Sequence, residues 1–170
     1  MDGSKQAVVS VGEGSEPPFS TALNDITPDL FSCKRAVRQA LRAAQLGTRD
    51  IQFFGRYDCF PICLIRAIEG VGLCPVGKGV EFVVAAYRNM LASNGVVGVS
   101  KFPINTHGGL QRFGAPWEVP AMYNVVEAIE QLSEAAGSCQ VFPVLGRALV
   151  YGNGGIFSAS YVVMLGDGAY

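Results

Sequence analysis

The chain has 170 residues, a formal net charge of −1 at pH 7 and hydrophobic residues at 49% of its positions, which fits one domain with a substantial core. The near-neutral charge and the lack of a basic run argue against nucleic acid as a partner, and no apolar stretch reaches the roughly 18 residues of a membrane span. Charged residues make up only 16%, against about 25% in typical soluble domains, so we expect another chain to cover part of the surface.

The first third of the chain predicts a strand, a helix and a second strand. AVVSVG at 7–12 is a short apolar run typical of a buried strand, and the Gly-, Ser- and Pro-containing segment 12–21 is a loop. Over 31–46 apolar residues recur at helical spacing with basic residues opposite them, and Gly47 ends this helix. Residues 51–55 then predict a strand that turns at its final glycine.

The middle of the chain predicts helical segments and one short strand. A mostly buried helix is expected over 60–71, helical character returns around 81–91, and KFPIN at 101–105 is a short strand. A further helix is expected over 117–135. Its apolar positions 122, 125, 126, 129, 132 and 136 form one stripe, with glutamates 127, 130 and 134 outside it.

The end of the chain predicts two strands, RALVYG and IFSASYVVML, which are joined by Asn-Gly-Gly. This turn chemistry is a strong hairpin signal and places an antiparallel turn about residues 152–155. Strands that alternate with helices and finish in a hairpin indicate a layered α/β domain with a mixed sheet.

The five cysteines form no CxxC pair. Cys59 and Cys63 are four residues apart, but zinc would need two further soft ligands and the chain has a single histidine, so no metal site is expected. Reduced, buried thiols are the better interpretation, and together with the absence of a signal peptide they predict a cytoplasmic protein.

Two common motifs are absent. VGKGV at 76–80 lacks the loop and the Ser/Thr of a phosphate-binding loop, and there is no GxSxG elbow. Three short stretches remain: GRYDCF (55–60), NTHGGLQRFGAP (105–116) and YGNGG (151–155). Their order and spacing resemble the carboxyl-terminal half of the thiolase superfamily, particularly its sterol-carrier-protein-type thiolases and thiolase-like aldolases.

The resemblance covers nearly all of residues 1–170 and implies one thiolase-like carboxyl-terminal domain. It implies a five-stranded mixed sheet with helices on both faces and a terminal hairpin. It also implies that the domain packs on a related amino-terminal half, which carries the nucleophilic Cys and is absent from this chain, and then dimerises. The implied partners are an acyl-CoA substrate and either a second copy, a thiolase-like subunit or an OB-fold protein. Coenzyme A enters as part of the substrate, and no other cofactor is implied.

The resemblance also places the catalytic groups. A thiolase has a histidine in Gly-His-Pro where this chain has Ala115, and a cysteine near the position of Gly152. Claisen chemistry needs a thiolate and a base with a pKa near 7, and neither Ala115 nor Gly152 can move a proton. His107 occupies the variable position before Gly-Gly and does not replace the missing histidine. An ordinary thiolase activity is therefore excluded.

The aldolase branch loses the same groups and implies tyrosine chemistry in a retro-aldol cleavage of acyl-CoA. Tyr57 is the candidate catalytic residue, since its Tyr-Asp-Cys-Phe stands where the sterol-carrier-type branch has His-Asp-Cys-Phe. A tyrosine phenol, whose ordinary pKa is about 10, would need a depressed pKa or a proton relay to act as the base. His107 could be such a relay or could bind the substrate; alternatively, it is a hydrogen-bonded loop residue and Tyr57 is structural.

The glycine loops are the candidate substrate-binding residues. Their backbone N–H groups could stabilise an enolate oxygen, although glycines also serve simply to permit tight turns. All three motifs lie at strand ends, so we expect them to converge on one cleft. The rival hypothesis is a non-catalytic thiolase-like subunit or truncated remnant that binds acyl-CoA or a partner. The predicted substrate-binding residues are Asn105, Gly108, Gly109, Gly154 and Gly155.

Overall fold

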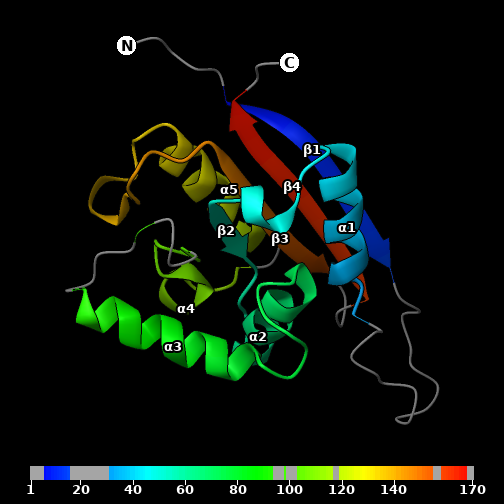
Figure 1. The fold of residues 1–170 in the computed structure, drawn as a ribbon, viewed down its shortest axis with the longest axis horizontal. Helices are drawn as coiled ribbons and strands as arrows, with labels where there is room; N and C mark the ends of the chain where they lie inside the picture. The colour runs from blue at the N-terminus through cyan, green and yellow to red at the C-terminus, as the bar shows by residue number, and fades with distance from the viewer. Residues whose placement is uncertain are drawn as a thin grey trace.

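The fold is built on a mixed sheet of four strands in the order β1-β4-β3-β2 (Figure 1). The computed structural model describes residues 6–15, 31–93, 98, 103–116, 119–154 and 158–167. β1 and β3 both run antiparallel to β4, whereas β2 runs parallel to β3. The strands are β1 (Gln6–Ser15), β2 (Phe53–Arg56), β3 (Arg147–Gly154) and β4 (Ala159–Asp167).

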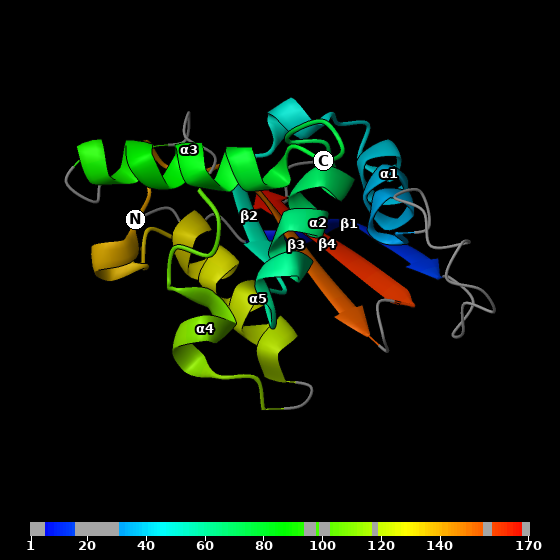
Figure 2. The same cartoon turned by 90° about the horizontal axis from the view of Figure 1, so that it is seen from below.

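Helices cover both faces of the sheet, as predicted. α1 packs on β1 and β4, α2 packs on α1, and α5 packs on the opposite face against β2 and β3 (Figures 1 and 2). The predicted helices over 31–46, 60–71 and 117–135 are all confirmed within a few residues at each end. The helices are α1 (Cys33–Ala43), α2 (Pro61–Val71), α3 (Gly79–Ala92), α4 (Gly109–Phe113) and α5 (Val119–Leu132), with 3-10 turns at Thr48–Asp50 and Gly137–Cys139.

Two cores lie on the two faces of the sheet. Phe53 and Phe54 are neighbours in β2 and therefore point to opposite faces, and both are fully buried. Phe54 joins the core formed with α1 and α2, and Phe53 joins the core formed with α5. A central sheet with a helical layer on each side is the layered α/β architecture expected from the sequence.

The sheet has four strands among the described residues, not five. At the open edge of β2, the described part of the predicted KFPIN strand forms one parallel bridge between Phe54 and Ile104, and residues 101–102 lie outside the described residues. Phe54 donates its N–H to the carbonyl oxygen of Pro103 at 3.0 Å and accepts the N–H of Asn105 at 3.2 Å. Pro103 has no N–H to offer a ladder, and Asn105 turns away with a φ of 47°, so the pairing ends there.

Strands β3 and β1 also differ from expectation. The terminal strands form the predicted antiparallel pair, but β3 continues through Asn153 and Gly154, which pair with Ser160 and Ala159. Asn-Gly is therefore part of the strand, and the connection lies beyond it. β1 is an edge strand rather than a buried one, since Val8 is 57% exposed.

The orientation of α5 was predicted wrongly. Glu127, expected outside, is buried, whereas Met122, Val126 and Ile129 of the predicted buried stripe are 56%, 49% and 41% exposed. The Glu127 carboxylate is retained inside because it accepts hydrogen bonds from the side chains of Thr106 and Gln131. A carboxylate can be buried when it is hydrogen-bonded, and apolar periodicity alone does not predict this.

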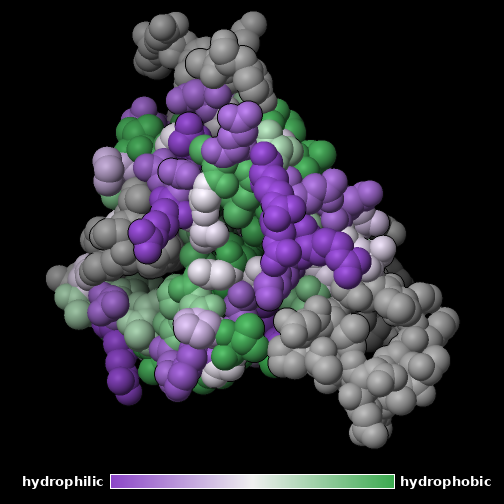
Figure 3. Space-filling model, turned by 45° about the vertical axis from the view of Figure 1, so that its right-hand side comes forward, coloured by the Kyte–Doolittle hydropathy of each residue, from purple (hydrophilic) through white to green (hydrophobic). Residues whose placement is uncertain are grey.

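The outer face of α1 is charged, as predicted. Figure 3 turns this side forward and shows hydrophilic side chains gathered in a band across it. Among the residues that the structure describes, no helix is both long and apolar enough to cross a membrane.

Gly12 allows α1 to approach β1 closely, and replacing it should destabilise the domain. A Cβ at this position would overlap the carbonyl oxygen of Ala36 and lie 2.8 Å from the nitrogen of Ala40. We expect Gly12→Ala to lower the free energy of unfolding by about 2 kcal/mol, because a backbone clash in a packed layer forces the helix to move. Urea denaturation monitored by circular dichroism measures this.

Gly47→Ala is the matched control, since the nearest atom to its added Cβ is Asp50 Oδ2 at 3.6 Å. Its free energy of unfolding should change by less than about 0.5 kcal/mol, as at ordinary surface positions. Equal losses in both variants would contradict the close packing of α1 on β1.

Candidate active site

Two of the predicted site residues, Tyr57 and Asn105, lie at the carboxyl end of β2, beside the parallel strand β3. Tyr57 directly follows β2 and donates its backbone N–H to the carbonyl oxygen of Tyr151 at 3.1 Å. Arg56 pairs with Tyr151 in the ladder, so Tyr57 lies beside the point where β3 continues into Gly152. Ligand sites in α/β sheets are found at such carboxyl ends.

Asn105 ties the NTHGG loop to the end of β2. Its side-chain Oδ1 accepts the backbone N–H of Arg56 at 2.7 Å, and its Nδ2 donates to the Arg56 carbonyl oxygen at 2.9 Å. The side chain thus continues the hydrogen bonding of the sheet where the backbone of the loop turns away. Asn105 fixes the loop beside Tyr57, while its predicted contact with substrate stays a prediction.

Asp58 binds the same loop from the other side. Its Oδ1 accepts the backbone N–H of Leu110 at 2.9 Å, and the residue is 7% exposed. Gly109 has a φ of 62°, and a Cβ there would overlap Asp58 Oδ2. Glycine is therefore required at position 109 by both the backbone conformation and the approach of the carboxylate.

A buried polar network lies beneath the loop. The Thr106 hydroxyl donates to Glu127 Oε1, and the Gln131 amide donates to the same oxygen at 3.0 Å. His107 Nδ1 lies 4.0 Å from Glu127 Oε2. The loop is thus held by hydrogen bonds both to the end of β2 and to α5.

The His107 ring is nearly enclosed. Its side chain is 11% exposed, and it stacks on Phe113 with ring centroids 5.4 Å apart. Neither ring nitrogen has a hydrogen-bond partner within the described part of the chain. The structure therefore does not join His107 to Tyr57, and the relay function of His107 stays a prediction.

Tyr57 is half-buried, and its environment disfavours the phenolate. Burial raises the pKa of Tyr57, and the neighbouring Cys59, Cys63 and Asp58 raise it further. The mechanism expected from the sequence required either a depressed pKa or a relay. Within this chain the pKa of Tyr57 is raised rather than depressed. The phenol therefore stays protonated and is suited to donating a proton or passing one on.

Arg56, which sequence reasoning missed, is a fully buried cation beside the site. Its guanidinium carbon lies 4.8 Å from the centroid of the Phe54 ring, and none of its three side-chain nitrogens has a hydrogen-bond partner among the described residues. Burial lowers the pKa of Arg56 to about 10, partly offset by Cys33 and Tyr151, so it remains charged at neutral pH. Nothing in the sequence pattern of β2 distinguishes it from a surface arginine.

Two thiols lie beside Tyr57. The sulfur atoms of Cys59 and Cys63 are 3.4 Å apart, within hydrogen-bonding distance, and all five cysteines are free thiols. Burial raises the pKa of Cys63 to about 11 and that of Cys33 to about 12. The pair forms no metal cluster, since no group of three metal-ligating side chains occurs among the described residues.

Alkylation should distinguish these thiols. We expect iodoacetamide at about pH 8 to modify Cys59 at least about tenfold faster than Cys63 or Cys33, because only the thiolate reacts and Cys59 is partly exposed. Peptide mass spectrometry over a time course measures the rates. Modification of Cys33 as fast as that of Cys59 would contradict the packing of α1.

The remaining predicted positions lie in β3, after α4 or outside the described residues. Gly152 and Gly154 belong to β3, where they pair with Tyr161 and Ala159. Gly155 lies outside the described residues. Ala115 is exposed and follows Gly114 at the end of α4, so the structure presents no proton-transferring side chain at this position.

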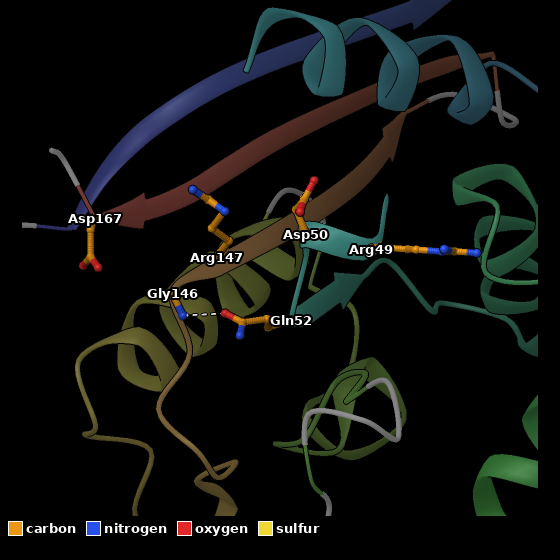
Figure 4. A pocket seen from close by; sticks show the side chains of 6 residues that line it. All are labelled: Arg49, Asp50, Gln52, Gly146, Arg147 and Asp167. Atoms are coloured by element: carbon orange, nitrogen blue, oxygen red, sulfur yellow. Dashed lines mark hydrogen bonds between the residues drawn. The ribbon is translucent and has the colours of Figure 1, made fainter. Parts of the chain in front are cut away.

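A polar hollow of about 500 Å³ lies at the opposite ends of β2 and β3 (Figure 4). The side chain of Gln52 accepts the Gly146 N–H there at 2.6 Å. Its two arginines and two aspartates balance one another, so it selects neither an anion nor a cation, and it is remote from the motifs. It is lined by Arg49, Asp50, Gln52, Gly146, Arg147 and Asp167.

Sheet topology, motif order and site geometry together define a thiolase-type α/β domain. Residues 12–167 match the family described as "Thiolase C-terminal domain-like", and the chain belongs to this family. This confirms the resemblance drawn from the three motifs.

Known proteins support the assignment over most of the chain. Benzoylsuccinyl-CoA thiolase subunit BbsB of Thauera aromatica is 25% identical over 138 residues, which cover 81% of this chain and 34% of that protein. The monomeric SCP2-thiolase like protein type 1 of Mycobacterium smegmatis superposes with a TM-score of 0.65 at 23% identity, covering 97% of this chain and 29% of that chain. The Ltp2-ChsH2(DUF35) aldolase superposes with a TM-score of 0.69 at 18% identity, covering 94% and 39%. The two structures share the fold, and the chain spans between 29% and 39% of these three proteins.

Proposed function

We propose that this domain takes part in carbon–carbon bond cleavage of β-hydroxyacyl-CoA by a retro-aldol reaction, as one portion of a larger active site. The observation that carries the proposal is Tyr57 at the end of β2, held beside a loop that Asn105 and Asp58 fix in place. Ala115 and Gly152 offer no proton-transferring group for Claisen chemistry. The structural likeness to an aldolase supports the same choice.

The proposed reaction needs no oxidant and consumes no free coenzyme A. A base removes the proton of the β-hydroxyl group, the bond between the α and β carbons breaks, and its electron pair forms the enolate of the thioester. A proton then returns to the α carbon. The products are a carbonyl compound and a shortened acyl-CoA.

Tyr57 is the residue proposed to move the proton. Because its pKa is raised, it accepts the hydroxyl proton only while passing its own to another group. His107 is proposed as that relay or as a substrate contact, since its ring nitrogens have no partner within the described part of the chain. Both steps depend on groups brought close by the substrate or a partner.

Gly109 is the donor proposed for the enolate oxygen. The N–H of Gly108 is already donated to the Asn105 carbonyl oxygen at 2.8 Å, and that of Leu110 is donated to Asp58. The N–H between them, on Gly109, donates to no group among the described residues. A fixed backbone donor at this position would stabilise the developing negative charge.

The exposed stripe of α5 supports an assembly with a second thiolase-like half or another partner. Val119, Met122, Val126 and Ile129 are between 41% and 56% exposed, and they follow one another at helical spacing. α5 has one exposed glutamate, Glu130, and no lysine or arginine, so a partner with basic or apolar side chains fits it better than a second α5. A thiolase-like or OB-fold subunit is the proposed occupant.

The second candidate function is a non-catalytic subunit that binds acyl-CoA or a partner. The nearly enclosed His107 and the raised pKa of Tyr57 favour this alternative if no partner supplies a base. The test is to assay the co-purified assembly and the isolated chain for cleavage of β-hydroxyacyl-CoA. Cleavage by the assembly supports the aldolase proposal, whereas tight acyl-CoA binding without cleavage in either sample supports the binding subunit.

A further inference from the structure

Helix α3 carries a stripe of apolar side chains that is exposed rather than packed against the domain. It lies along the edge of the molecule away from the sheet (Figures 1 and 2), and only Gly79 within it is buried. Val80, Val84, Tyr87 and Leu91 are 57%, 42%, 56% and 57% exposed. A helix with a continuous exposed apolar stripe requires a covering surface.

The spacing of this stripe is that of a coiled-coil seam. The intervals of four, three and four residues match successive d, a, d and a positions of the heptad repeat. We infer that a second copy of this chain covers the stripe by packing its α3 antiparallel against the first. The inference rests on the surface of α3 and does not depend on the chemistry proposed above.

The stripe is complementary to itself in this arrangement. In an antiparallel pair, a positions pack against d positions, so Val80 lies against the partner's Leu91 and Val84 against the partner's Tyr87. The two-fold axis then passes between Ala85 and Ala86.

The charges flanking the stripe select the antiparallel direction. Glu81 and Arg88 each follow a d residue and therefore occupy e positions. The e positions of two helices face each other only in an antiparallel pair. With the two-fold axis between Ala85 and Ala86, Glu81 lies level with the partner's residue 90. The partner's Arg88 is two residues from that level, an offset of about 3 Å along the helix at 1.5 Å per residue. Each dimer thus gains two such ion pairs.

The competing stripe on α5 lacks this property. It is equally exposed, but the same antiparallel arrangement of α5 helices would bring Tyr123 toward the partner's Tyr123, with no basic residue on either helix. α3 carries both charge signs in matching positions, and α5 carries one. This difference is why the second copy is assigned to α3.

The α3 contact predicts a weak dimer. Two heptads bury less than the roughly 800 Å² per partner of a standard interface, so we expect a dissociation constant on the order of 10 µM at low salt. Glu81 also forms an ion pair with Lys78 at 2.7 Å, and both side chains are exposed. Exposed ion pairs contribute little free energy, so this one does not prevent Glu81 from pairing with the partner's Arg88.

Charge-swap variants of the full chain test the inference by sedimentation equilibrium. We expect Arg88→Glu and Glu81→Arg each to weaken the dimer by about tenfold, because each places like charges in both flanks. The double variant should return to within about threefold of the unmodified chain. Val84→Asp should abolish the dimer, while the matched change Val126→Asp on α5 should leave it intact.

Circular dichroism controls for folding, and each changed side chain is exposed. A chain that stays monomeric to about 100 µM overturns the inference. So does a dimer lost in Val126→Asp but kept in Val84→Asp, or a double variant as weak as the single ones. Antiparallel pairing of α3 is supported if the dimer is weakened in both single variants and its affinity recovers in the double variant.

Discussion

Replacing Tyr57 by Phe is expected to lower retro-aldol turnover of the assembled protein by about 10²-fold or more, the usual scale for losing a general acid or base. The change removes one hydroxyl from a half-buried ring and leaves its packing in place. The free energy of unfolding should therefore change by less than about 1 kcal/mol. Steady-state kinetics on β-hydroxyacyl-CoA together with urea denaturation separate the two effects.

The pH dependence gives a second test of the same residue. The pKa of Tyr57 is raised above the ordinary tyrosine value of 10.0, so the phenol is protonated from about pH 7 to about pH 9. If Tyr57 donates or relays the proton, the chemical step should be flat across this range. A rate that rises tenfold per pH unit would mean that the phenolate is the base, and unchanged turnover in Tyr57→Phe would eliminate the tyrosine mechanism.

Replacing Glu127 by Leu should destabilise the domain by about 3 kcal/mol. The residue is 4% exposed, and its carboxylate accepts hydrogen bonds from Thr106 and Gln131. Removing it takes this acceptor from the half-buried Thr106 hydroxyl and from the buried Gln131 amide, and a donor left unsatisfied costs about 1–3 kcal/mol. Chemical denaturation measures the loss, and faster amide hydrogen exchange in the NTHGG loop should accompany it because α5 no longer holds that loop.

Glu130→Leu is the matched control on the same helix. Glu130 is exposed, so its replacement should change stability by less than about 0.5 kcal/mol and leave exchange in the loop unchanged. Equal effects of the two substitutions would contradict the buried network. Glu127→Gln, which keeps the shape and an acceptor oxygen, should recover part of the stability lost in Glu127→Leu.

Local patterns predicted most of the fold correctly. Helix α2 starts at Pro61 and is followed directly by Gly72, which has a φ of 86°, and both residues are sequence signals for those positions. The terminal strands and the placement of helices on both faces were also predicted. The strand count was not, because pairing at the edge of β2 depends on the conformation of Pro103–Asn105 rather than on apolar periodicity.

Sequence motifs predicted part of the candidate site but not the side chains that hold it in place. The motifs predicted that Tyr57 and the NTHGG loop lie close together, and in the structure Asn105 of this loop is hydrogen-bonded to Arg56, the residue before Tyr57. They could not locate Asp58 as the group that fixes Gly109, or Glu127 as a buried carboxylate, because both depend on contacts across more than twenty residues of sequence. The spacing of Glu127 and Gln131, four residues apart on one helix face, was the available signal.

Product analysis tests the central claim most directly. The co-purified assembly is incubated with free coenzyme A and, in separate samples, a β-hydroxyacyl-CoA or a β-ketoacyl-CoA, and the carbonyl product, the thioester products and free thiol are followed over time. The retro-aldol account predicts a carbonyl product and a shortened acyl-CoA in equal amounts, with no loss of free thiol. Consumption of one free thiol per cleavage of a β-ketoacyl-CoA, or no cleavage of either substrate by the assembly, would contradict it.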